Sequence, residues 1–163
     1  MSDAGETFSD LLGDLDYPMF IVTVAAGGQR AGCLIGFATQ GSIDPPRFLA
    51  LISEKNRTFR VARDASALAV HLAPDDKPEL AELFGSETGD EIDKFERCDW
   101  SEGPGGLPIL DDCPSWFCGE VLERLDCGDH VGFLLEPFAA QRGHGDEPFP
   151  FHRAKRMEPG HPA

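Results

Sequence analysis

A short basic segment is the part of this chain whose residue types most clearly suggest chemistry. Residues 47–63 contain five basic residues and one acidic residue, whereas residues 64–141 contain four basic and nineteen acidic residues. The five basic residues are Arg47, Lys55, Arg57, Arg60 and Arg63. The whole chain carries a formal net charge of −15. Because a cationic stretch in so acidic a chain attracts negative ligands, this basic segment predicts a site for an anion.

The sequence around the basic segment favours a phosphate group as that anion. Residues 48–53 form an apolar run that predicts a buried strand, and Asn56 is a favourable N-cap for a helix over residues 58–65. The first turn of a helix offers free backbone N–H groups and the positive end of the helix dipole. The polar side chains at this junction are Ser53, Lys55, Asn56, Arg57 and Thr58. The spacing also fits a capped, solvated helix whose arginines pair with the acidic remainder, and it leaves both interpretations open.

A glycine-bearing strand candidate precedes the basic segment. Residues 32–46 include Gly36, Ala38 and Gly41 and end in the double proline Pro45-Pro46. Small residues expose the backbone, so a flat ring can approach the main-chain N–H and C=O groups closely. The alternative is a hairpin strand that runs into a rigid turn, and the pattern alone does not separate the two.

Other candidate catalytic residues carry weaker signals. His130 begins an apolar stretch, where a lone histidine is more often a structural hydrogen-bonding group than a catalyst. His144 and His152 have no partner at a metal-ligand spacing, which argues against a metal site. The sequence contains no P-loop, no dinucleotide-binding glycine fingerprint and no Gly-x-Ser-x-Gly motif.

These residues require a framework of strands joined by short turns. Strands are predicted over residues 19–25, 33–39, 48–53, 67–72, 108–110, 115–124, 130–141 and 149–153. Helices are predicted over residues 7–15, 58–65 and 75–84, with short helical turns over 88–95 and an extended tail over 158–163. Short turns favour an antiparallel sheet, so we expect a mainly β fold in which six or seven strands close into a barrel with helices at its side.

Length and composition indicate one globular domain over residues 1–163. Hydrophobic residues make up 41% of the chain and charged residues 26%, the balance of a folded protein. The acidity argues against binding nucleic acid or an anionic membrane surface. No apolar run approaches the roughly 20 residues that cross a bilayer, and the acidic start lacks the features of a signal peptide, so we expect a cytoplasmic protein. Five cysteines without a C-x-x-C pair predict free thiols.

Taken together, these motifs resemble the flavin reductase family with the FMN-binding split-barrel fold. The resemblance covers residues 17–142 and rests on the order of the motifs. In chain order they are the strand from Gly32 into Ser42-Ile43-Asp44-Pro45-Pro46, the apolar strand followed by Asn56-Arg57-Thr58, the helix ending Leu80-Ala81-Glu82-Leu83-Phe84, the block Gly106-Leu107-Pro108-Ile109-Leu110, and Gly128-Asp129-His130.

The resemblance implies a fold and a set of ligand-binding residues. The fold is a six- to seven-stranded antiparallel FMN-binding split β-barrel with its core at about residues 17–142, a short N-terminal helix and a C-terminal extension. FMN, with FAD as the alternative flavin, is implied to lie against the strand before the double proline. The residues implied for its ring and ribityl chain are Ile35, Gly36, Phe37, Ala38, Thr39 and Gln40, and those implied for its phosphate are Ser53, Lys55, Asn56, Arg57 and Thr58. His130 is implied to lie near the flavin or the nicotinamide.

The resemblance also implies an activity. The expected enzyme is an NAD(P)H-dependent flavin reductase that passes a hydride from the nicotinamide co-substrate to flavin N5 and works as a homodimer, with a monooxygenase as a candidate partner. Many family members carry Thr or Ser where this chain has Leu34 and Phe37, so polar contacts to the ring fall to the backbone and to Thr39 and Gln40. Two other functions stay open: an FMN-binding electron carrier or flavin store without nicotinamide turnover, and a non-catalytic split-barrel module.

Overall fold

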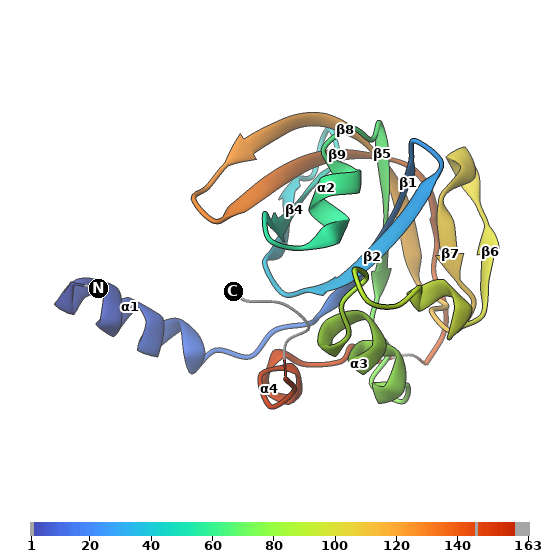
Figure 1. Ribbon diagram of the computed structural model, residues 1–163. Helices are drawn as coiled ribbons and strands as arrows, with labels where there is room; N and C mark the ends of the chain where they lie inside the picture. The colour runs from blue at the N-terminus through green and yellow to red at the C-terminus, as the bar shows by residue number, and fades with distance from the viewer. Residues whose placement is uncertain (1, 146, 159–163) are drawn as a thin grey trace.

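The computed structural model describes residues 2–145 and 147–158, and its main feature is a curled antiparallel sheet of seven strands (Figure 1). The order across the sheet is β2-β1-β5-β8-β9-β4-β3. The strands are β1 (Phe20–Ala26), β2 (Gln29–Ile35), β3 (Ala38–Ser42), β4 (Arg47–Ser53), β5 (Ala67–Leu72), β8 (Trp116–Asp126) and β9 (His130–Gln141). Every neighbouring pair is antiparallel, as the short turns of the sequence predict.

The sheet closes around a single apolar interior. Strands β2 and β3 follow each other in the chain but lie at the two edges of the sheet. Inward-facing residues of most strands meet in one buried cluster, which includes Val22, Cys33, Ala50, Val70 and Phe133. Helix α2 (Arg57–Ala62) occupies the opening of the barrel, where Val61 and Ala62 join this cluster (Figure 1). The expected split β-barrel is therefore confirmed.

Smaller elements cover the outside of the barrel. Helix α3 (Pro78–Ser86) packs against β2, and α4 (Phe151–Ala154) lies next to it (Figure 1). A two-stranded ribbon of β6 (Trp100–Glu102) and β7 (Pro108–Leu110) flanks the sheet, with short 3₁₀ turns at Lys94–Glu96 and Pro104–Gly106. Helix α1 (Asp3–Gly13) projects away from the barrel and buries no residue. Among the described helices, none is long and apolar enough to cross a bilayer.

A buried histidine joins the main sheet to the ribbon. Nδ1 of His71 lies 2.9 Å from the carbonyl oxygen of Ile21, and Nε2 accepts a hydrogen bond of 3.1 Å from the Leu110 N–H. Burial lowers the pKa of His71 to about 4, so the ring is neutral near pH 7. His71 is therefore a structural hydrogen-bonding group that bridges two layers of the fold.

Two strand predictions are wrong. The strand expected over residues 33–39 is broken at Gly36 into β2 and β3, because the chain turns there beneath the ring of Tyr17, where an added Cβ would lie 2.8 Å from a ring carbon. The strand expected over residues 149–153 is instead the helix α4, which follows two isolated β-bridges at Pro148 and Pro150. Prolines on both sides of Phe149 lack the N–H groups that a longer ladder needs.

The helix predictions hold in position but not in length. Helix α2 ends at Ala62, three residues before the predicted end. Helix α3 runs from Pro78 to Ser86, so it begins three residues after the predicted start and ends two residues after the predicted end. The helical turns predicted over residues 88–95 reduce to the 3₁₀ turn Lys94–Glu96. The extended tail predicted for the C-terminus lies, from residue 159 on, outside the described residues.

All five cysteines are free thiols, as predicted. Cys33, Cys113 and Cys118 are buried and Cys98 is half-buried. Cys127 differs, because it lies exposed in the turn between β8 and β9.

Candidate functional site

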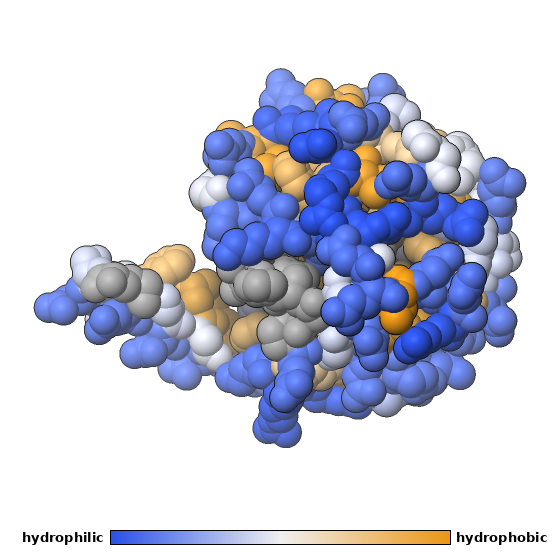
Figure 2. All heavy atoms as spheres, in the orientation of Figure 1, coloured by the Kyte–Doolittle hydropathy of each residue, from blue (hydrophilic) through white to orange (hydrophobic). Residues whose placement is uncertain are grey.

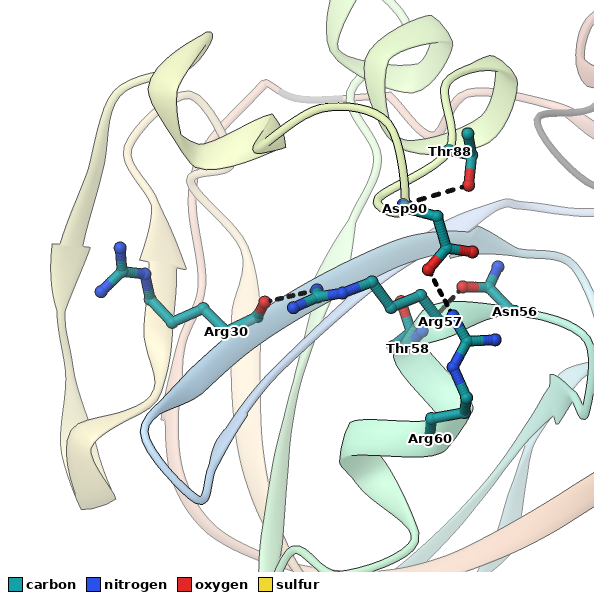
Figure 3. Close-up of polar contacts among 7 residues, drawn as sticks. All are labelled: Arg30, Asn56, Arg57, Thr58, Arg60, Thr88 and Asp90. Atoms are coloured by element: carbon teal, nitrogen blue, oxygen red, sulfur yellow. Dashed lines mark hydrogen bonds and ion pairs between the residues drawn. The ribbon is translucent and has the colours of Figure 1, made fainter.

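A polar pocket of about 360 Å³ lies beside the start of α2. Three segments line it: residues 28–32 at the start of β2, residues 56–58 at the start of α2, and the loop 89–95. Figure 3 shows Asn56, Arg57 and Asp90 close together in this region, with the backbone carbonyl of Arg30 facing Arg57 and the Arg30 side chain pointing away. Three of the five predicted phosphate residues, Asn56, Arg57 and Thr58, therefore share a pocket that has cationic neighbours.

Arg57 spans this pocket. Its Nη1 donates a hydrogen bond of 2.8 Å to the backbone oxygen of Arg30 on the opposite wall (Figure 3). The stem of the side chain runs past Gly89, where an added Cβ would lie 3.3 Å from Cδ of Arg57. Because Gly89 has no side chain, the Arg57 side chain has room to lie across the pocket. The other N–H groups of the Arg57 guanidinium can donate to a ligand oxygen.

Lys94 is a pocket residue that the sequence did not reveal. The side chain is only 5% exposed, and Nζ donates to the carbonyl oxygens of Gly32 (3.1 Å) and Phe84 (3.0 Å). Burial lowers the pKa of Lys94. A lysine between Asp93 and Phe95 in an acidic stretch has the sequence signature of an exposed turn, so no local signal marked it. Its ammonium joins β2 to the end of α3 and adds positive charge to the wall of the pocket.

Acidic residues of the loop 89–95 balance the cations. Asp90 forms an ion pair with Arg60 of α2, and its backbone N–H donates a hydrogen bond of 3.2 Å to Thr88 Oγ1 (Figure 3). This pair ties the loop to the helix, so Arg60 closes the pocket and does not enter it. Of the three basic residues that line the pocket, Arg57 extends its guanidinium across it. The Lys94 ammonium is buried in the wall, and the Arg30 guanidinium lies 4.6 Å from the Trp100 ring.

The backbone at the start of α2 differs from the expectation. Hydrogen bonds occupy the N–H groups of Glu54 (to Asp129 O, 3.0 Å) and Asn56 (to Ser53 O, 3.0 Å). They also occupy those of Lys55 (to Ser53 Oγ, 3.4 Å) and Thr58 (to Asn56 Oδ1, 2.9 Å). The expected set of free N–H groups is therefore wrong at these four residues, since the tight turn and the Asn56 cap already use them. An anion here must be held mainly by side chains.

A second group of predicted residues meets at the edge of the sheet. Ser53 and His130 are direct cross-strand partners in β4 and β9. The rings of Phe37 and His130 lie 4.9 Å apart, and the carbonyl of Phe37 accepts from the Leu51 N–H at 2.9 Å. Nδ1 of His130 lies 2.7 Å from the Asp129 carboxylate, whose pKa this hydrogen bond lowers. The fold thus brings residues 37, 53 and 130 together although they are far apart in the chain.

The predicted ring-binding residues 35–40 follow the turn from β2 into the edge strand β3. Ile35 is buried, Gly36 and Ala38 are half-buried, and Phe37 is 53% exposed. Thr39 and Gln40 are exposed, but their side chains hydrogen-bond to their own strand, at Gln40 O (3.3 Å) and Ser42 O (3.4 Å). The accessible surface of this segment is therefore Phe37, the two polar side chains and the backbone of an edge strand.

One face of the sheet beside this edge is apolar and uncovered by the described helices. Because Ala50, Ile52, Val131 and Phe133 point inward, the alternating positions point outward. Cross-strand register aligns Leu51 with Gly132 and Leu125, and Leu49 with Leu134. We call Phe37, Leu49, Leu51, Leu125 and Leu134 the outer face. Such a contiguous apolar surface marks an interaction site.

Residues 12–159 match the family described as "Flavin reductase like domain". The chain belongs to this family. A "Probable flavin reductase" of Rhizobium meliloti (strain 1021) is 29% identical over 114 residues, which are 68% of this chain and 36% of that relative. The "4-hydroxyphenylacetate 3-monooxygenase reductase component" of Salmonella typhimurium is 25% identical over 85% of this chain and 84% of its own length. The chain spans about a third to a half of the first two curated relatives that it matches.

Solved structures share this fold. A flavin reductase domain protein from Arthrobacter sp. FB24 has a TM-score of 0.83 at 24% identity and covers 98% of this chain and 96% of its own. An FMN-binding protein from Thermus thermophilus has a TM-score of 0.75 at 26% identity, covering 81% and 75% of the two chains. The likeness extends over nearly all strands and helices described above.

Proposed function

We propose that this protein is an NAD(P)H-dependent flavin reductase that binds FMN and transfers a hydride from the nicotinamide to flavin N5. The observation that carries the proposal is the presence of two features after the end of β4: a pocket that the Arg57 guanidinium spans, and an exposed Phe37 ring that contacts His130. A phosphate-bearing flavin needs both of these. Membership of the flavin reductase family supports the same conclusion.

The cationic pocket fits a phosphate monoester. Asn56, Arg57 and Thr58 line it, and Arg57 already reaches across it to the opposite wall. Lys55 and Ser53 lie at the turn between this pocket and the strand edge, and we propose that they complete the phosphate site. Because hydrogen bonds occupy most backbone N–H groups of the turn, the Arg57 guanidinium is the main donor. Thr58 is buried, so its part is to fix the start of α2.

The strand edge fits a flat ring. We propose that residues 35–40 border the isoalloxazine, with Phe37 covering it and the backbone of β3 supplying polar contacts. His130 is the proposed positioning residue for the nicotinamide, because the Asp129 carboxylate and the Phe37 ring hold its orientation. The flavin and the nicotinamide supply the hydride chemistry when bound. The chain aligns the two rings and excludes water, which are the main contributions that such a site makes.

FMN is the proposed flavin and FAD the alternative. FMN carries one phosphate monoester, which matches the one guanidinium that spans the pocket, that of Arg57. The 26% identical structure from Thermus thermophilus is named as an FMN-binding protein, which supports this choice. Competition between FMN and FAD for the purified protein, read as flavin fluorescence, distinguishes the two.

We also propose that two copies associate through the outer face. Leu49, Leu51 and Leu134 form an apolar sheet surface that adjoins Phe37, so a second copy there would lie beside the ring site. The curated relative named as a reductase component of a monooxygenase supports a monooxygenase as the consumer of the reduced flavin.

Anaerobic mixing with NADH or NADPH tests the proposed activity. The FMN-loaded protein is expected to lose its visible flavin absorbance within seconds of mixing with one of the nucleotides. If neither nucleotide bleaches the bound flavin, the protein is an electron carrier or flavin store. If the purified protein binds no added FMN, the split barrel is a non-catalytic module.

A further inference from the structure

Helix α1 is the one helix of the described chain that buries none of its residues and still carries an apolar stripe. Phe8, Leu11, Leu12 and Leu15 are 64, 58, 38 and 50% exposed. Figure 2 shows apolar side chains gathered on this projecting arm. A helix of 11 residues is marginal in water unless its apolar side is packed against something, so a partner surface is needed.

We call residues 13–17, which join α1 to the barrel, the root of α1, and contacts with α4 and the residues next to it fix their position. The ring of Tyr17 stacks on that of Phe151 at 4.5 Å with an interplanar angle of 8°. The His152 N–H donates to Asp16 at 3.0 Å, and Lys155 Nζ donates to the Gly13 carbonyl at 3.0 Å. Because α4 anchors these residues, the arm is directed away from its own barrel (Figure 1).

The root also lies at the rim of the outer face. The Tyr17 ring sits against Gly36, where an added Cβ would be 2.8 Å from it. The next residue, Phe37, belongs to the outer face. Helix α1 starts at the rim of the outer face and points away from its own barrel. A molecule that covers the outer face would therefore lie within reach of α1.

The distribution of charge indicates which surface α1 binds. Residues 3–16 carry five acidic side chains and no lysine or arginine. On β4, Leu49 and Leu51 follow Arg47, which lies 3.7 Å from Glu136, and Lys55 comes just after the strand ends, so the leucines lie within the basic segment of this acidic protein. An acidic, apolar helix therefore matches the β4 side of the outer face. The acidic turn between β8 and β9 would repel it.

We propose that α1 docks on a second copy of this chain, on the β4 side of its outer face, with the two copies exchanging arms. In a dimer with two-fold symmetry, α1 of each copy packs on the outer face of the other copy. One interface then buries the apolar stripe of α1 and the outer face in both copies. This inference rests on the proposed homodimer and adds the element that clasps it.

The test uses the full-length protein and two neighbouring substitutions on α1. Leu11→Ser removes an apolar side chain from the stripe, whereas Asp10→Ser introduces the same residue on the opposite side of the helix. Dimer dissociation is measured by sedimentation over a dilution series. Leu11→Ser is expected to raise the dissociation constant about tenfold for each of the two arms, about 100-fold in total, and Asp10→Ser less than tenfold. Equal effects of the two variants, or no effect of either, would overturn the proposal.

Hydrogen exchange separates docking on a second copy from docking on the same chain. The amides of α1 are expected to be protected at concentrations above the dimer midpoint and unprotected below it. If the α1 amides are protected equally at all concentrations, the helix docks on its own chain and the exchange of arms is wrong. The proposal is also wrong if these amides are unprotected in the dimer, or if the protein stays monomeric at all concentrations. FMN binding and NADH bleaching are read on the unmodified protein, so a failure of the reductase function is recognised independently of the arm.

Discussion

The ring of Phe37 lies 4.9 Å from the imidazole of His130, between their centroids. Phe37 comes from the turn between β2 and β3, and His130 begins β9 opposite Ser53. The closure of the barrel brings these residues together, and Ser53, the cross-strand partner of His130, precedes the pocket residue Asn56 by three positions. This proximity links the proposed ring site to the proposed phosphate site.

Arg57→Ala is expected to weaken FMN binding about 10- to 100-fold and to leave riboflavin binding unchanged. The variant removes the charge-assisted hydrogen bonds that the guanidinium makes to the phosphate, which are the strong ones in such a site. Titration of each flavin by fluorescence quenching measures both affinities. Arg63→Ala is the matched control, because Arg63 belongs to the same basic segment but lies exposed beyond the pocket. An equal loss for FMN and riboflavin would argue against a phosphate contact.

Phe37→Ala is expected to slow flavin bleaching by NADH about tenfold or more, because a loosely covered ring is misaligned for hydride transfer. Stopped-flow absorbance measures the rate. Phe138→Ala is the control, since Phe138 lies at the other end of β9 and is 50% exposed, against 53% for Phe37. Similar rates in the two variants would remove Phe37 from the site.

Lys94→Met is expected to lower the free energy of unfolding by about 2 kcal/mol, because the carbonyls of Gly32 and Phe84 lose a charged, buried donor. Urea unfolding followed by circular dichroism measures the change. Lys77→Met applies the same substitution at a half-buried lysine outside the pocket and is expected to have little effect. The FMN-to-riboflavin affinity ratio of the Lys94 variant should also fall, since the wall of the pocket loses a positive charge; an unchanged ratio would limit Lys94 to a structural role.

His71 predicts a loss of stability in acid. Its pKa is about 4 in the folded protein and near 6.5 in the unfolded chain, so only the unfolded state binds the proton between these values. The contribution of His71 to the free energy of unfolding is complete above pH 6.5. As the pH falls toward 4, the free energy of unfolding decreases by up to about 3 kcal/mol. Urea unfolding between pH 7 and pH 4.5 measures this slope.

His71→Gln should reduce the slope, since glutamine does not titrate. His144→Gln is the control, because His144 is exposed and outside any regular element. Equal slopes in the wild type and the His71 variant would show that other groups cause the acid sensitivity.

Local patterns in the sequence were sufficient for most of the framework. Apolar runs and turn residues predicted β4, β5 and β9 closely, and the Asn56 cap marked the start of α2. The errors arose where distant contacts override local preference. Tyr17 packs on Gly36 and divides one predicted strand into two, and the prolines around Phe149 convert a predicted strand into α4.

The site was predictable only in part for the same reason. Charge counting identified the basic segment, and three of its predicted residues line the pocket. It missed Arg30 and Lys94, which line the pocket from β2 and from the segment after α3. It also overestimated the free backbone donors, because the Ser53–Asn56 turn uses them internally. Such contacts depend on the closed barrel and leave no mark on neighbouring residues.

A crystal structure of the protein with FMN tests the central claim most directly. The account predicts that the phosphate lies within hydrogen-bonding distance of the Arg57 guanidinium and the Asn56 side chain, with the isoalloxazine against residues 35–40. A phosphate bound elsewhere, with the pocket beside α2 left to solvent, would contradict it.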